Sequence, residues 1–130
     1  MRSRIWLVLW IVGILFPMEF LARVWPAFGS VFNPIFSPDW VHIFMHTLLY
    51  TVLVFLLAQI ISPVSLKAGL VLAGLGLLVG CLQESLQLLS ARVWPGWPPE
   101  ILDLSVDLLG AVIGISLSLL ATRIKRAANH

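Results

Sequence analysis

Residues 101–122 read ILDLSVDLLGAVIGISLSLLAT and combine an apolar stretch long enough to cross a bilayer with two aspartates. A transmembrane helix needs about 20 mostly apolar residues. Asp103, Asp107, Gly110 and Gly114 recur every three or four residues, so a helix places them on one face. Ionisable groups inside a bilayer are costly and usually have a partner or a function. The stretch therefore predicts a membrane helix whose polar stripe faces other helices.

Three more apolar stretches are long enough to span a membrane. We expect them at about residues 5–25, 40–61 and 66–89, with the fourth span at about 101–122. Proline-containing breaks separate them at Asn33-Pro34, at Ser62-Pro63 and between Pro95 and Pro99. The first stretch resembles a signal peptide at its start but has no clean cleavage site. We expect it to remain as a helix that is kinked near Pro17.

The composition also indicates a membrane protein. The chain has 130 residues, of which 60% are hydrophobic and 11% are charged, whereas soluble domains have about 25% charged residues. The chain is too short for two domains, so residues 1–130 form one domain. The basic residues stand at the ends of the spans, which does not indicate a nucleic-acid partner. The predicted fold class is all-α, a membrane-embedded four-helix bundle.

The basic residues predict how the bundle is oriented. Six of them fall on one side of the four spans, namely Arg2, Arg4, Lys67, Arg123, Lys125 and Arg126, and two fall on the other side, Arg23 and Arg92. Loops rich in lysine and arginine stay in the cytoplasm. We therefore expect both termini to be cytoplasmic.

Polar residues of three spans lie at the same predicted depth. His46, Glu84 and Asp107 each lie roughly 8–10 Å from the outer end of their helix, at about 1.5 Å per residue. We therefore predict one polar pocket that opens outward, with Gly110 and Gly114 allowing close helix contact at its floor. The candidate pocket residues are His42, His46, Glu84, Gln87, Arg92, Asp103 and Asp107.

The order of these residues resembles the VanZ-like family, which is named for a teicoplanin-resistance protein. The resemblance covers about Asp39 to Gly114. Its motifs are His46-x3-Tyr50, then Glu84-x2-Gln87 followed by Arg92, then Asp103-x3-Asp107-x2-Gly110-x3-Gly114. Two positions differ from the family: His42 stands where an Asp is usual, unless Asp39 takes that role, and Asp107 replaces an Asn. The resemblance implies a small multi-pass protein of the bacterial cytoplasmic membrane, and it implies a link to the cell envelope or to glycopeptide susceptibility such as teicoplanin resistance.

Three functions remain open from the residues, beside a purely structural network that locks the helices together. The pocket could recognise an amphipathic ligand, such as a lipid headgroup, a cell-wall precursor or a glycopeptide, with membrane lipids as its neighbours. The chain could be a non-catalytic accessory subunit bound to a membrane-protein partner. It could also be a metal-assisted intramembrane hydrolase. Metal ligands would come from three helices without a compact motif, so we predict no metal or other cofactor.

Overall fold

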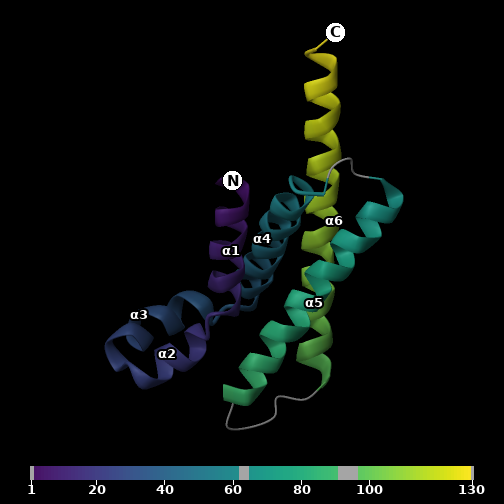
Figure 1. The fold of residues 1–130 in the computed structure, drawn as a ribbon. Coiled ribbons are helices and arrows are strands. Elements are labelled where there is room, and N and C mark those ends of the chain that lie inside the picture. The colour runs from purple at the N-terminus through teal and green to yellow at the C-terminus, as the bar shows by residue number, and fades with distance from the viewer. Residues whose placement is uncertain (1, 62–64, 91–96, 130) are drawn as a thin grey trace.

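The computed structural model describes residues 2–61, 65–90 and 97–129, and this part of the chain is helical without a strand (Figure 1). The helices are α1 (Arg2–Leu15), α2 (Met18–Val24), α3 (Pro26–Phe36), α4 (Asp39–Ala58), α5 (Leu66–Ser90) and α6 (Trp97–Ala127). By length and composition α4, α5 and α6 can each cross a membrane. The all-α class is therefore confirmed for the described residues, and three helices long and apolar enough to span a membrane indicate a multi-pass membrane protein.

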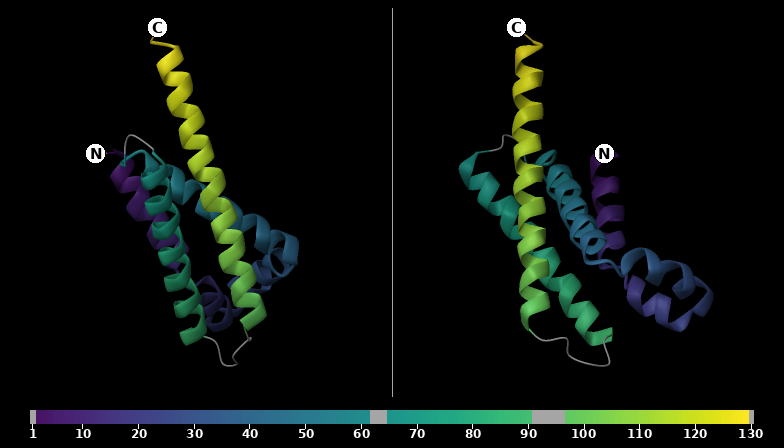
Figure 2. Two further views of the ribbon diagram at one scale, coloured as in Figure 1. Left: turned by 90° about the vertical axis from the view of Figure 1, so that its right-hand side faces the viewer. Right: turned by 180° about the vertical axis from the view of Figure 1, so that it is seen from behind.

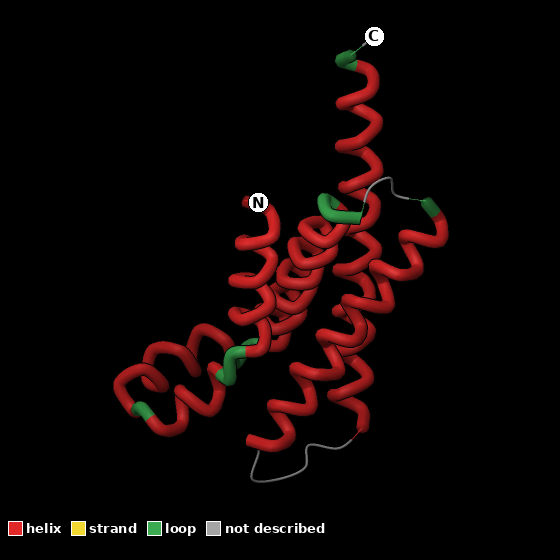
Figure 3. Tube along the Cα trace, viewed as in Figure 1, coloured by secondary structure: helices red, strands yellow, loops and turns green. Residues whose placement is uncertain are grey.

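The first predicted span differs from the structure. Helix α1 ends at Leu15, and α2 begins beyond Pro17, which has no N–H group to continue the α1 hydrogen bonds. Figure 3 shows the loop between the two helices. The prediction of one kinked helix over residues 5–25 is therefore wrong. At 14 residues α1 is about 21 Å long, which is less than the roughly 30 Å of a hydrocarbon core.

Helices α2 and α3 form a short hairpin at one end of the molecule (Figure 2). Trp25 has an extended backbone between them, and Pro26 then starts α3, a position where proline is well tolerated. The two helices touch at Gly29, because a Cβ atom there would overlap the carbonyl oxygen of Ala22. The hairpin therefore depends on a residue without a side chain.

The remaining spans lie close to their predicted positions. Helix α5 agrees with the predicted 66–89, and α4 with 40–61 apart from its last residues. Helix α6 is longer than the predicted 101–122 at both ends. It begins at Trp97, so Pro98 and Pro99 fall in its first turn. Backbone N–H groups in the first turn of a helix make no intrahelical hydrogen bond, so proline, which has no N–H group, is tolerated there.

Helices α4 and α6 pack closely and run in the same direction, because α5 returns the chain between them (Figures 1 and 2). A Cβ atom at Gly110 would lie 2.6 Å from the carbonyl oxygen of Thr47, and one at Gly114 would lie 2.6 Å from that of Thr51. The Thr51 hydroxyl also donates to the Gly110 carbonyl at 3.1 Å. Only residues without a side chain allow this approach.

Apolar packing joins the other helices to this pair. Val54 and Ala58 of α4 pack with Leu72 of α5 and Ala111 of α6. Helix α1 is fixed to α4 by the indole of Trp10, which donates to the Leu49 carbonyl at 2.9 Å. These contacts join α1, α5 and α6 to α4, which carries the polar residues.

Both ends of the chain lie at the same end of the molecule (Figure 1). The start of α1, the end of α4 and the start of α5 lie at this end, the end of α6 projects beyond them, and the α2–α3 hairpin lies at the opposite end. Lys67 and Arg123 are therefore at the end shared with the termini, and Arg23 is at the hairpin end. The basic residues that are unevenly distributed in the sequence are therefore also unevenly distributed between the two ends of the described structure.

Candidate functional site

The polar face of α4 forms a stack of three rings. His42, His46 and Tyr50 follow one another at intervals of four residues, which places them on one side of the helix. The ring centroids of His42 and His46 are 4.3 Å apart, and those of His46 and Tyr50 are 6.3 Å apart. The stack runs from the hairpin end of α4 towards the middle of the helix.

Two aspartates of α6 meet the two histidines in register. His42 Nε2 lies 2.9 Å from Asp103 Oδ1, and His46 Nδ1 lies 2.8 Å from Asp107 Oδ1. Each pair joins residues 61 positions apart. Because α4 and α6 run in the same direction, the spacing of four residues on one helix matches the spacing of four on the other.

Burial differs sharply between the two pairs. The side chains of His42 and Asp103 are 38% and 14% exposed, whereas those of His46 and Asp107 are 6% and 0% exposed. The outer pair is therefore accessible and the inner pair is sealed. A carboxylate only accepts hydrogen bonds, so the inner pair assigns the hydrogen of His46 to Nδ1 and leaves the lone pair of Nε2 for another contact.

Helix α5 closes the cluster from a third side. A Cβ atom at Gly80 would lie 2.6 Å from Asp107 Oδ2, so glycine makes room for the carboxylate. The Tyr50 hydroxyl donates to Gln83 Oε1 at 2.9 Å. Glu84 is buried on the same helix at 6% exposure. The three helices that are long and apolar enough to cross a membrane thus all contribute polar groups to one region.

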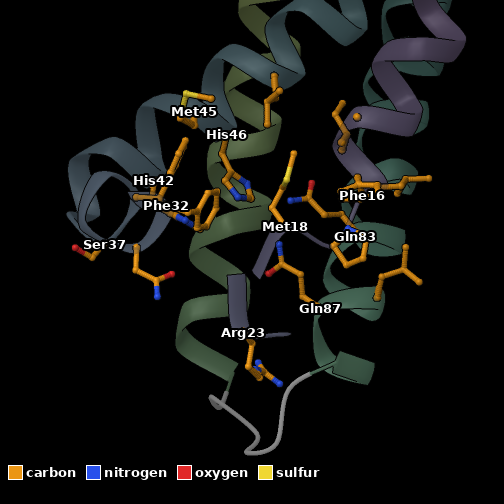
Figure 4. Close-up of a pocket in the computed structure, with 18 residues that line it drawn as sticks. Phe16, Met18, Arg23, Phe32, Ser37, His42, Met45, His46, Gln83 and Gln87 are labelled. Atoms are coloured by element: carbon orange, nitrogen blue, oxygen red, sulfur yellow. The ribbon is translucent and has the colours of Figure 1, made fainter. Parts of the chain in front are cut away.

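A cavity of about 650 Å³ adjoins the cluster, between α4, α5, the end of α1 and the α2–α3 hairpin. His42 and His46 form part of its wall. Figure 4 shows Gln83 and Gln87 of α5 extending towards His46, with Arg23 of α2 near Gln87. The other polar lining residues are Asn33 and Ser37, and the apolar ones include Ile14, Leu15, Phe16, Met18, Phe32, Phe36, Met45, Leu49 and Leu86.

The structure brings most of the predicted pocket residues into one region. The histidines and aspartates make direct contacts, Gln87 lines the cavity beside the histidines, and Glu84 is buried in the same part of α5. Gly110 and Gly114 lie where α6 touches α4, one and two turns beyond the aspartates. Arg92 lies outside the described residues.

Sequence reasoning missed two cavity residues, Gln83 and Arg23. Gln83 is four residues before Gln87, so both face the cavity, and this spacing was a usable signal. The interpretation followed the Glu84–Gln87 pair instead. The sequence places Arg23 at the same membrane face as the pocket, but its spacing of four from Glu19 favours a local pair on the first span, so it is not among the predicted pocket residues. The break at Pro17 is what brings α2 to the cavity.

The cluster can donate and accept hydrogen bonds and can also offer metal ligands. One ligand atom each from His42, His46 and Asp103 lies within 4.8 Å of the others. The apolar part of the cavity wall suits hydrocarbon, and the polar part suits a headgroup. No protein-family model, curated protein or solved structure matches the chain, so these side chains alone carry the functional argument.

Proposed function

We propose that this protein is a VanZ-like multi-pass protein of the bacterial cytoplasmic membrane, and that its cavity recognises the polar head of an amphipathic ligand of the cell envelope. The observation that carries the proposal is the cavity beside the His–Asp pairs, which combines polar and apolar walls. Its volume of about 650 Å³ is within the range of small-molecule sites. A lipid headgroup, a lipid-linked cell-wall precursor and a glycopeptide share the required chemistry.

The polar wall defines what the head of the ligand should contain. Arg23 supplies a fixed positive charge, and the amides of Gln83 and Gln87 supply both donors and acceptors. Arginine binds phosphate through paired hydrogen bonds, and amides suit sugar hydroxyls. The ligand is therefore a phosphate-bearing or glycosylated amphiphile, and its hydrocarbon part lies against the phenylalanines of α3 and the end of α1.

The VanZ-like assignment rests on the motifs of three helices taken together. The structure is compatible with it, because the His46–Tyr50 face of α4 meets the Asp103–Gly114 stripe of α6. In this chain Asp107 replaces the usual Asn and accepts a hydrogen bond from His46.

An accessory subunit of a membrane complex is the alternative. Purification with a partner chain and without bound lipid would favour that alternative.

In the proposed topology α1 is the fourth crossing and both termini are cytoplasmic. The basic end of the molecule then faces the cytoplasm, and the cavity lies towards the outer leaflet. The shortness of α1 is compensated by local thinning of the bilayer around the α2–α3 hairpin.

Cysteine labelling tests this topology. In a Cys81→Ser background, Ser30→Cys in α3 should react with a membrane-impermeant maleimide in intact cells, and Ser65→Cys should not. The Ser65→Cys variant should react after the cells are permeabilised, which controls for access. Labelling of Ser65→Cys alone in intact cells would reverse the orientation and place the cavity on the cytoplasmic side.

Lipid binding tests the ligand class. Arg23→Gln should weaken binding of dioctanoyl phosphatidylglycerol at least tenfold, because a hydrogen bond to a charged group contributes about 1.5–3 kcal/mol. Native mass spectrometry of the protein in detergent would give the bound fraction. Arg4→Gln, an exposed arginine at the opposite end, is the matched control and should bind as the wild type does.

Three ligands separate the sources of the headgroup in the same assay. Phosphatidylglycerol, undecaprenyl phosphate and phosphatidylcholine distinguish an anionic phospholipid, a lipid carrier of cell-wall synthesis and a neutral headgroup. Equal binding of all three, or equal binding by Arg23→Gln and wild type, would contradict a headgroup site at Arg23.

A further inference from the structure

Three potential metal ligands converge beside the cavity, two of them in its wall, and they come from two helices held in fixed register. His42 and His46 belong to α4 and Asp103 belongs to α6, and one ligand atom from each lies within 4.8 Å of the others. Two ligand atoms bound at about 2.1 Å to a tetrahedral metal are about 3.4 Å apart. The His42–Asp103 distance of 2.9 Å is already shorter than that. The three atoms are thus already gathered within 4.8 Å, and the side chains need to adjust to bring them to the separations of bound ligands.

The inner pair provides a second and independent indication. Metal-bound histidines usually donate their other ring N–H to a carboxylate or carbonyl, which fixes the ring and directs its lone pair at the metal. His46 makes such a bond, because its Nδ1 lies 2.8 Å from Asp107 Oδ1 and both side chains are almost fully buried. Asp107 therefore orients His46 without itself reaching the metal.

The surroundings leave room for further ligands. His42 and His46 line the cavity, so the side of the cluster that faces away from α6 is open. His42 is the most exposed member, which gives an ion a route into the site. Three protein ligands with an open position are typical of metal sites that bind a substrate or water, whereas structural zinc sites use four protein ligands.

We propose that His42, His46 and Asp103 bind one divalent transition-metal ion, such as zinc, at the wall of the cavity. The two imidazoles select zinc, cobalt, nickel, copper or iron over magnesium and calcium. In the metal-bound state His42 binds through Nε2 and carries its hydrogen on Nδ1. Coordination therefore requires that the hydrogen moves from Nε2 to Nδ1, and the imidazole loses no proton. The open coordination position faces the cavity, and this site does not depend on the lipid ligand proposed above.

The structure also explains why the sequence alone did not predict the site. His42 and His46 have the spacing of metal ligands on a helix, but the third ligand is 61 residues away from His42. Nothing in the sequence selects Asp103 over Glu84 as that ligand. The parallel packing of α4 and α6 places Asp103 beside His42. It places Asp107 beside His46, where Asp107 orients the imidazole and does not bind the metal.

A cobalt titration tests the proposal. The protein is purified through a histidine-free tag, treated with EDTA and titrated with Co²⁺ in detergent without added lipid. The wild type should bind one equivalent, with the visible d–d absorption of a low-coordinate ion, and Zn²⁺ should displace the Co²⁺. Bound metal should also raise the Tm, because a ligand that binds only the folded state stabilises it.

Matched variants locate the site. His46→Gln and Asp103→Asn should abolish the Co²⁺ absorption, and Asp107→Asn should weaken binding by about 10- to 100-fold while keeping one equivalent, as expected for a group that orients a ligand. Asp39→Asn, which alters an exposed carboxylate at the start of α4, should bind as the wild type does. Circular dichroism and size-exclusion chromatography confirm that each variant is folded.

Two results would overturn the proposal. The first is a wild-type protein that shows neither Co²⁺ absorption nor a metal-dependent rise in Tm, and this result does not require any variant to fold. The second is full binding of one equivalent by folded His46→Gln and Asp103→Asn. Either result would mean that the two His–Asp pairs are structural hydrogen bonds between α4 and α6. Neither result would affect the lipid-binding test at Arg23.

Discussion

Gly110→Leu should prevent α4 and α6 from packing and should leave little folded protein. A Cβ atom at this position would lie 2.6 Å from the Thr47 carbonyl oxygen and 3.0 Å from Tyr50 Cβ. Both neighbours belong to the α4 helix itself, so they cannot move aside as the end of a flexible side chain could. The helices must separate, and the contacts of the fully buried Tyr50 are lost with them.

The size of the effect should grow with the side chain. Gly110→Ala should cost about 1–3 kcal/mol, as overpacking usually does, and Gly110→Leu should cost more. Gly114→Ala should resemble Gly110→Ala, since its Cβ atom would lie 2.6 Å from the Thr51 carbonyl oxygen. Unfolding by increasing SDS, followed by tryptophan fluorescence, would give the free energies.

Gly74 is the matched control, because nothing lies within 4 Å of a Cβ atom placed there. Gly74→Ala should leave the free energy of unfolding unchanged or raise it by about 0.5–1 kcal/mol, since alanine favours a helix over glycine. Equal losses of stability for Gly74→Leu and Gly110→Leu would show that the glycines of α6 do not determine the packing.

Removing both members of the His46–Asp107 pair should cost less than the sum of the two single removals. In Asp107→Ala the His46 N–H loses its acceptor in an almost fully buried position, and in His46→Leu the carboxylate loses its donor. A buried polar group left without its partner costs about 1–3 kcal/mol, and more if it is charged. We therefore expect each single change to destabilise the metal-free protein by about 2 kcal/mol.

A double-mutant cycle measures this coupling. His46→Leu with Asp107→Ala should be at least about 1 kcal/mol more stable than the sum of the single effects predicts, because no buried polar group is left alone. Interhelical hydrogen bonds in membranes contribute about 0.6 kcal/mol on average, so this value would mark a strong pair. The measurement is SDS unfolding in the presence of EDTA.

The outer pair supplies the comparison for this cycle. His42 is 38% exposed, so other polar groups can replace Asp103 as its partner. The cycle of His42→Leu and Asp103→Ala should therefore give a coupling of less than about 1 kcal/mol. Equal coupling energies for the two pairs would mean that burial does not set the strength of the inner one.

Periodicity predicted the faces of the helices but not the contacts between them. The spacing of His42, His46 and Tyr50 correctly identifies one face of α4, and the spacing of Asp103 and Asp107 identifies one face of α6. Which aspartate meets which histidine depends on the length of α5 and on how the chain enters α6. These properties arise from the assembled helices, so one pairing could not be preferred over the other from the spacing of the residues alone.

The break in the first predicted span has a similar cause. Proline is compatible with either a kink or a helix end, and a long apolar stretch favours the kink. The structure ends α1 at Leu15 because the residues beyond it pair with α3, through the contact of Ala22 with Gly29. Gly29 lies outside the apolar stretch, so the hydropathy of residues 5–25 alone could not reveal this contact.

The parallel pairing of α4 and α6 has a consequence for how the protein is made. Each His–Asp pair is divided between helices that emerge from the ribosome with α5 between them, so His46 enters the bilayer before Asp107 has been synthesised. An imidazole without its partner is costly in hydrocarbon, and the surface of α4 that later receives Gly110 is still uncovered. Insertion of α6, the last helix, is therefore the step that completes the buried His–Asp pairs and the helix packing. A chain stalled before that step presents a polar signal by which membrane chaperones and quality-control proteases can recognise it.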